Sequence, residues 1–231
     1  MRQIILDTET TGLSVEAGHR IIEIGAVEIM DRRMTGNNYQ TYLNPKRSID
    51  PGSIAVHGIT NDDVADKPEF KEVMQEFLSF IQDTELLIHN APFDTAFINH
   101  EFSLVGYGKK IEDLCEIKDT LPIARKTHPG KRNSLDALCA RYNVNTSNRE
   151  LHGALIDAKL LGQVYLLMTG GQVGFFGDNQ NLYEQQTSHS LNIDFSERKI
   201  MMVELTNEDL EEHQQYLEDL LADSDQPFFK Y

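Results

Sequence analysis

An α/β fold is predicted for residues 1–168, followed by a tail of different composition. Three strand-like segments occur in succession near the start, which favours an antiparallel meander. Further along, a short buried strand is flanked by apolar stripes at helical spacing, which favours a sheet covered by helices. Beyond Met168 the composition changes to glycine and polar residues, so the folded unit is expected to end there.

The first three strands follow from apolar runs. Gln3–Thr8 is a short apolar run that leads into Thr-Glu-Thr-Thr-Gly, which is typical of a buried strand entering a turn. Ile21–Met30 and Tyr39–Asn44 also have strand character. The segment Met34–Asn38 contains glycine and asparagine, and it is predicted to connect these two strands.

The later elements follow from apolar residues at helical spacing. They are a helix over Pro68–Gln82, a buried strand over Glu85–His89, a helix opened by Pro92, a helix that carries Cys139 and is capped by Asn133 or Ser134, and a last helix that ends near Met168. Cys139 belongs to an apolar stripe, so we expect it to be a buried free thiol. The chain has two cysteines, and no disulfide framework is implied.

The composition is that of a globular protein with an acidic balance. The 231 residues are 40% hydrophobic and 25% charged, and the net charge is −16, of which residues 169–231 contribute −10. No apolar run approaches the ~18 residues of a membrane span, and the start has no secretory signal, so a cytoplasmic protein without a membrane role is expected. A chain this acidic binds polyanions poorly without metal ions or a partner, so any nucleic-acid role must be local or assisted.

Two acids leave the first predicted strand on the same side. Asp7 and Glu9 are two residues apart, and the period of a strand points both carboxylates to one face. Two such charges about 4 Å apart repel by ~4 kcal/mol at an effective dielectric of ~20, so a bound cation would stabilise the pair. Taken alone, the pair fits a metal site and a solvated strand end equally well.

Two later segments add acids and a histidine. Asp94 is expected in the first turn of the helix opened by Pro92, where its simplest role is to complement the helix dipole. His152 and Asp157 are five residues apart, which is about 140° on an ideal helix, so they cannot share a face within one regular helix. His152 therefore reaches the same site only from the loop or first turn before that helix, and Gly153 permits the bend.

Together these segments resemble the three motifs of the DEDDh 3′–5′ exonucleases. The matching segments, in chain order, are Asp7–Leu13, His89–Asp94 and His152–Asp157. The resemblance implies a ribonuclease-H-like fold, which is a mixed five-stranded sheet with helices on both faces. It also implies an enzyme that removes nucleotides from 3′ ends with two divalent ions.

Within that family, the chain is most similar to the proofreading subunits of bacterial replicative DNA polymerases. The similarity covers residues 1–172 nearly throughout and returns weakly at 200–221. It is carried by Ile21–Glu28, Thr35–Asn38, Val56–Ile59, Pro129–Tyr142 and Met168–Gln172. It implies removal of mispaired 3′-terminal nucleotides from DNA.

The resemblance also implies a role for each motif residue. Asp7, Glu9 and Asp157 match ligands of the first metal ion, with Asp7 bridging to the second, and Asp94 matches the acid that supports the second ion through water. His152 matches the general base. Carboxylate oxygens suit Mg²⁺ or Mn²⁺. The same three metal ligands, together with Thr10 and His57, match the residues around the terminal nucleotide, which leaves as a 5′-monophosphate. For His57 alone, the sequence leaves open the alternative of a loop histidine without a role.

A basic segment lies between Lys118 and Arg149, in contrast to the acidic balance of the chain. Lys131 and Arg132 precede a predicted helix cap, where their charge and the helix N-terminus would together favour a phosphate. This segment is either a DNA-facing surface or an ordinary solvated one, and the sequence leaves both readings open.

The tail is predicted to have two parts. Residues 169–199 are expected to be a flexible linker, in which Gln172, Phe175 and Phe176 are similar to the short peptides that bind bacterial sliding clamps, although their spacing departs from the usual form. Residues 200–231 contain a leucine stripe on an acidic helix. They resemble the segment that holds the catalytic (alpha) subunit of the polymerase.

Two other functions remain as alternatives. An RNA-trimming DEDDh exonuclease would have the same motifs, but such enzymes generally lack a glycine-rich linker with a clamp-like peptide. A non-catalytic tether between polymerase and clamp would need the tail but not a costly cluster of acids.

Overall fold

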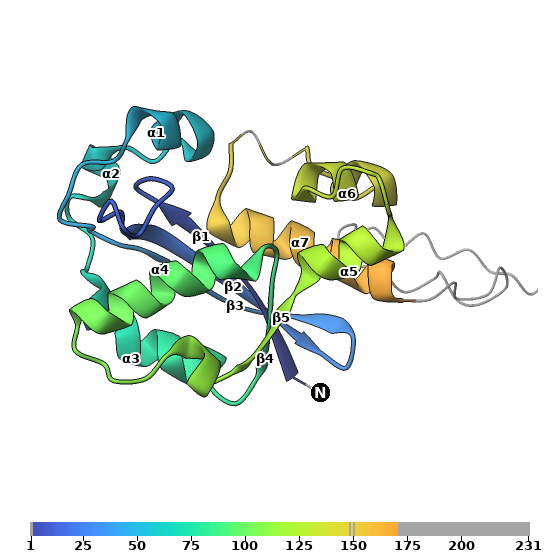
Figure 1. The fold of residues 1–231 in the computed structure, drawn as a ribbon, viewed down its shortest axis with the longest axis horizontal. Helices are drawn as coiled ribbons and strands as arrows, with labels where there is room; N and C mark the ends of the chain where they lie inside the picture. Colours follow the sequence, from blue (N-terminus) through green and yellow to red (C-terminus); the bar gives the residue numbers. More distant parts are fainter. Residues whose placement is uncertain (1, 148, 150, 171–231) are drawn as a thin grey trace, which may run out of the picture. The chain divides into compact units, whose positions relative to one another are not determined.

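The computed structural model describes residues 2–147, 149 and 151–170, in which the strands form one mixed five-stranded sheet (Figure 1). The strand order is β3-β2-β1-β4-β5. Neighbours β1 and β2 are antiparallel, as are β2 and β3, whereas β4 runs parallel to β1 and β5 parallel to β4. The strands are β1 (Arg2–Thr10), β2 (Ile21–Met30), β3 (Arg33–Tyr42), β4 (Glu85–Ile88) and β5 (Glu116–Asp119). The meander and the mixed sheet are thus confirmed.

The predicted connection at Met34–Asn38 is wrong, because these residues lie inside β3. The hairpin turns instead at Asp31 and Arg32, whose φ angles of 48° and 62° are those of a tight two-residue turn. β3 is an edge strand and most of its side chains are exposed, so glycine and asparagine are tolerated there. Turn-forming composition was therefore a misleading signal at this edge.

Helices cover both faces of the sheet, as expected. α3 (Phe70–Ile81) and α4 (Ala91–Leu104) pack with Ile4 and Leu6 of β1 on one face. α7 (Ala154–Thr169) packs with Ile5 on the other. The remaining helices are α1 (Pro51–His57), α2 (Asn61–Val64), a 3₁₀ turn η1 (Ile111–Asp113), α5 (Thr120–Thr127) and α6 (Leu135–Tyr142). In the described residues, no helix has the length and apolar character that a membrane span requires.

The start of α7 lies directly on β2. A Cβ atom added to Gly25 would lie 2.1 Å from the backbone nitrogen of Leu155, so only glycine permits this approach. Gly25 pairs with Asp7 in the sheet. The first turn of α7 is therefore brought next to the end of β1, where the acids of the first motif lie.

Candidate active site

Asp7 and Glu9 occupy the carboxyl-terminal half of β1 and alternate with the buried Thr8. Ile5 is on the same side as the two acids, and it packs against α7. Both carboxylates therefore face the helix that carries Asp157. The prediction that they share one face of the strand is confirmed.

Asp94 lies in the first turn of α4, as predicted, and is 3% exposed. Asn90 precedes the helix with a φ of 67°, and Pro92 is in its first turn. The Oγ1 atom of Thr8 donates a hydrogen bond to Oδ1 of Asp94 at 2.7 Å. A residue on the opposite face of β1 from the two acids thus fixes the third acid beside them.

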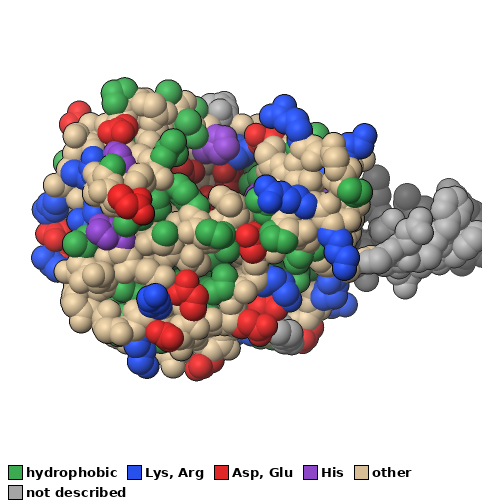
Figure 2. Space-filling model, in the orientation of Figure 1, with side chains coloured by type: hydrophobic (Ala, Val, Ile, Leu, Met, Phe, Trp, Pro, Cys, Tyr) green, Lys and Arg blue, Asp and Glu red, His purple; other side chains and the backbone are tan. Residues whose placement is uncertain are grey.

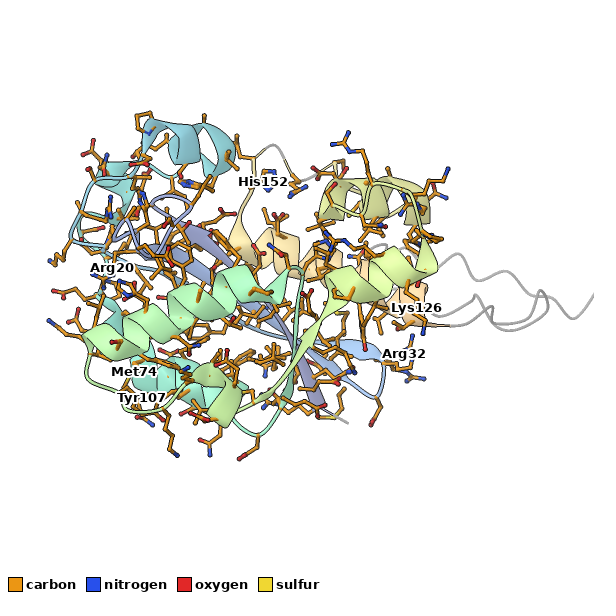
Figure 3. The ribbon with its side chains drawn as sticks, in the orientation of Figure 1. Arg20, Arg32, Met74, Tyr107, Lys126 and His152 are labelled. Atoms are coloured by element: carbon orange, nitrogen blue, oxygen red, sulfur yellow. The ribbon has the colours of Figure 1, made fainter. Side chains whose placement is uncertain are left out.

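His152 precedes α7, which begins at Ala154, whereas Asp157 lies in the first turn of the helix. The Nδ1 atom of His152 is 3.0 Å from Oδ2 of Asp157. The expectation that His152 approaches from the entering loop is therefore confirmed, and Figure 3 shows it there. The backbone nitrogen of Ala154 donates to Oε2 of Glu23 at 3.1 Å, so a buried acid of β2 holds the start of the helix.

The acids repel one another strongly in the absence of cations. Burial and then the charge of Asp94 raise the pKa of Asp7 well above its ordinary value. Burial and then the charge of Asp157 raise the pKa of Glu9 to about 8. Burial raises the pKa of Asp94 to about 7, although the hydrogen bond from Thr8 opposes this shift. Such a cluster is costly to keep ionised without a counter-charge.

The cluster has the composition of a divalent cation site. Single ligand atoms of Glu9, His152 and Asp157 lie within 4.8 Å of one another. Oδ1 of Asp157 is buried, and its one polar contact in the described residues is the ion pair with Nε of Arg149 at 2.6 Å. Carboxylate oxygens are the ligands that Mg²⁺ and Mn²⁺ prefer. These residues fit a divalent ion, although the group contains His152 where the motifs predict Asp7, and Figure 2 shows acidic side chains at the floor of a hollow in the surface.

Two functional candidates were missed by the motif analysis. Arg149 contacts Asp157 through Nη2 at 2.7 Å from Oδ2 and through Nε at 2.6 Å from Oδ1. Glu23 holds the start of α7, as described above. An acid within the apolar run of β2 was a signal for Glu23, whereas nothing in the sequence separated Arg149 from the other basic residues around it.

His57 lines a cavity of about 460 Å³ next to His152. His57 is 6% exposed, and its Nδ1 accepts a hydrogen bond from the backbone nitrogen of Ile59 at 3.0 Å. Burial lowers the pKa of His57, although a backbone hydrogen bond with Thr10 opposes this shift. Because Nδ1 accepts from Ile59, the neutral ring carries its proton on the buried Nε2. Thr10 is buried and its hydroxyl donates to the carbonyl of Gly12.

The basic candidates lie apart from the acids, near α5 and α6. Lys131 lines a groove of about 840 Å³ together with Arg125, Asn90 and Ser134. Arg132 is exposed, and Ser134 is the residue that caps α6. Figure 2 shows basic side chains gathered on this part of the surface. The clamp-peptide residues Gln172, Phe175 and Phe176, the segment 171–199 and the segment 200–231 lie outside the described residues.

The fold and the acid cluster together define a nuclease of the DEDDh type. Residues 4–165 match the family model described as "Exonuclease". The chain is 48% identical over 229 residues to DNA polymerase III subunit epsilon of Haemophilus influenzae, which covers 94% of this chain and 89% of the relative. The identity to the same subunit of Escherichia coli K12 is 47% over 224 residues, covering 94% and 92%. The chain therefore belongs to the DEDDh exonuclease family, in its epsilon-subunit branch, and is a 3′–5′ exonuclease.

Solved structures agree with this assignment. Exonuclease X in complex with 5′ overhanging duplex DNA is 27% identical, with a TM-score of 0.58 over 74% of this chain and 92% of that chain. The nuclease domain of 3′hExo, a DEDDh family member bound to rAMP, has a TM-score of 0.59 at 20% identity over 72% and 90%, and this similarity bears on the fold alone. The family is dependent on divalent metal ions, and the acid cluster fits that requirement.

Proposed function

We propose that this exonuclease removes mispaired nucleotides from the 3′ ends of DNA as the proofreading subunit of a replicative polymerase. The observation that carries the proposal is the convergence of Asp7, Glu9, Asp94 and Asp157 from three separate elements, with His152 beside them. The epsilon relatives that span 94% of the chain support the replicative role. The aligned region extends far beyond residue 168, so the similarity of this chain to the epsilon relatives includes the tail.

In this proposal, Asp7, Glu9 and Asp157 hold one of two divalent ions, Mg²⁺ or Mn²⁺, and Asp7 and Asp94 support the other. When bound, such ions lower the pKa of a water molecule and stabilise charge on the attacking and leaving oxygens. The protein itself supplies fixed carboxylates on a strand and two helix ends. Thr8 and Glu23 keep those supports in place through their hydrogen bonds.

His152 accepts the proton of the attacking water. An Nδ1–H group that donates to Asp157 would leave Nε2 free to accept a proton, and this is the tautomer that a general base at Nε2 requires. The side chain of His152 is 42% exposed, so water and substrate can reach it. His152 therefore combines a fixed orientation with access from solvent.

The terminal nucleotide binds in the cavity beside His57. The Nε2–H group of His57 is a buried donor without a hydrogen bond of good geometry, and it is suited to an oxygen of the nucleotide. Thr10 lines the same end of β1 and shapes the turn that follows. Lys131 and Arg132 contact the phosphate backbone further along the strand, since a local basic surface is needed on so acidic a chain.

Residues beyond the nuclease domain (1–168) connect it to the replication machinery. Gln172, Phe175 and Phe176 bind the sliding clamp, and residues 200–231 bind the alpha subunit of the polymerase, with 169–199 as the linker. In full-length protein, Phe175→Ala with Phe176→Ala should weaken clamp binding alone. Leu220→Glu with Leu221→Glu should weaken alpha binding alone. Loss of both interactions in either variant would contradict this division of the tail.

A direct test uses 5′-labelled primers with a mismatched 3′ end, with and without Mg²⁺. The wild-type protein should shorten the DNA from its 3′ end only when metal is present, and Asp157→Asn should not. Glu76→Gln, which removes an exposed acid of α3, is the matched control and should be active. A labelled RNA strand serves as the second substrate, and a strong preference for RNA would favour the RNA-trimming alternative. Absence of digestion of either strand would favour the tether.

A further inference from the structure

One basic side chain lies within the acid cluster. Among the lysines and arginines that the structure describes, Arg149 alone forms an ion pair with any of the four motif acids. Its side chain is 8% exposed, and it contacts both carboxylate oxygens of Asp157. Its charge also opposes the rise in the pKa of Glu9. A permanent cation thus occupies the neighbourhood in which a divalent ion must bind.

The contact of Arg149 with His152 conflicts with the proposed role of that histidine. Nη2 of Arg149 is 2.7 Å from Nδ1 of His152, and the same Nδ1 is 3.0 Å from Asp157. A guanidinium group can only donate, so in this contact Nδ1 accepts and the neutral ring carries its proton on Nε2. That tautomer cannot accept a proton at Nε2. The arrangement is therefore a resting one.

Arg149 has a second acidic partner outside the cluster. Its Nη1 atom is hydrogen-bonded to Oδ1 of Asp136 on α6, whose side chain is 66% exposed. A guanidinium displaced from Asp157 can therefore keep an ion pair with Asp136. The two carboxylates, one buried and one exposed, provide two positions for the same charge.

We infer that Arg149 is the resident counter-cation of the acid cluster, which the incoming metal ion displaces toward Asp136. This inference rests on the proposed metal site. Arg149 acts as a positioning residue: it holds Asp157 and His152 in the resting arrangement and releases both when metal binds. Molecules in the resting arrangement bind metal only after the guanidinium moves away, which lowers the apparent affinity for metal. Removal of the guanidinium should therefore raise this affinity.

The test is a calorimetric titration of the full chain with Mn²⁺, at fixed pH and ionic strength. Arg149→Met should bind Mn²⁺ about tenfold more tightly than the wild type, because the competing cation and its repulsion are gone. Lys126→Met removes an exposed charge on α5 and is the matched control, with unchanged affinity (Figure 3). Unchanged or weaker binding by a folded Arg149→Met protein would overturn the inference.

A second variant avoids reliance on the buried arginine. Asp136→Asn removes the exposed partner, so Arg149 stays on Asp157 and Mn²⁺ should bind a few-fold more weakly. In the Arg149→Met background, the same change should have no effect, which is the coupling that a double-mutant cycle measures. Equal effects of Asp136→Asn in both backgrounds would overturn the inference. If the wild type binds no Mn²⁺, the proposed metal site fails as well, whereas normal binding with no change in the variants refutes this inference alone.

Discussion

Two groups of buried or half-buried carboxylates in this protein have opposite surroundings. Glu101 on α4 is 1% exposed and receives two hydrogen bonds from Arg20, at 2.7 and 2.6 Å, and a third from the backbone of Ile21. Asp7, Glu9 and Asp94 lie on the same sheet and helices, yet the structure describes no lysine or arginine paired with them. Arg149, which pairs with Asp157, offsets only part of their mutual repulsion, and a cation from outside is needed to offset the rest.

We interpret the difference as one between structural acids and the acids that we propose to be functional. A buried acid with its own cation is strongly destabilising only when one partner is removed. A buried cluster of acids is destabilising as it stands, and such clusters are retained where the charge is needed for chemistry. Removal of an acid should therefore affect stability at Glu101 and activity at the cluster.

The largest effect is expected from Asp7→Asn. The variant keeps the size of the side chain but loses a ligand charge, so the rate of 3′ digestion should fall by roughly a thousandfold or more. The melting temperature without metal should stay the same or rise, because one source of repulsion is removed. Single-turnover digestion measures the rate, and calorimetry measures the melting temperature. A destabilised but active Asp7→Asn protein would reverse the comparison.

Glu101→Gln should lower stability and leave activity unchanged, which is the reverse of the effect expected for Asp7→Asn. The change leaves Arg20 without its carboxylate in a largely buried position, which costs about 3–5 kcal/mol of unfolding free energy. Activity per folded molecule should remain close to wild type, because Glu101 is not among the cluster acids. Urea unfolding measures the first effect, and initial rates normalised to the folded fraction measure the second. A stability loss below about 1 kcal/mol would show that the pair is not structural.

The pH dependence of the metal-free protein sharpens the comparison further. The pKa of Glu9 is raised to about 8 and that of Asp94 to about 7, so the folded state holds more protons than the unfolded chain from about pH 4 to about pH 8. The stability that these protons provide is complete below the ordinary carboxyl range and is lost as pH rises through those values. The melting temperature should therefore fall by several degrees between about pH 5 and about pH 8 and level off above about pH 8.

Two controls identify the source of that fall. Glu9→Gln should have a shallower decline, since one titrating group is gone. Saturating Mg²⁺ should remove the decline, because the ion binds the ionised form of the native state. A decline that Mg²⁺ and Glu9→Gln leave unchanged would assign the effect to other groups.

Thr8→Val should have the smallest effect. It removes the hydrogen bond to Asp94 at nearly constant volume, which costs about 1 kcal/mol of stability. The hydroxyl also opposes the rise in the pKa of Asp94, so its loss should shift the dependence of activity on pH toward higher pH. Rates across a pH series check the shift. An unchanged profile would mean that Asp94 is held by other contacts.

The sequence predicted the parts of the molecule whose pattern is strongly periodic. β1, β2, α3 and α7 have continuous apolar faces, and the helical angle between His152 and Asp157 was enough to exclude His152 from the helix. β5 has no buried residue, and the helices α1 and α2 are short, so their patterns are weak. Turn-like composition misplaced the connection before β3.

The acids of the candidate site were predictable from the sequence, but the basic residue beside them, Arg149, was not. The acids stand out because they interrupt apolar runs or open helices. Arg149 is one of several basic residues in its segment, and its importance follows from contacts with Asp136 and Asp157 that only the folded chain creates. A long-range contact of this kind leaves no periodic signal along the sequence.

The central claim is that protons and metal ions compete for the same unpaired acids, and counting protons tests it most directly. Titration of the wild type with Mn²⁺ in buffers of different ionisation enthalpy gives the number of protons released per ion. The account predicts release of about one proton per chain or more near pH 7 and a smaller release near pH 9, since the pKa values of Glu9 and Asp94 lie between about 7 and about 8. Binding without proton release at either pH, or release that persists unchanged in Glu9→Gln, would contradict it.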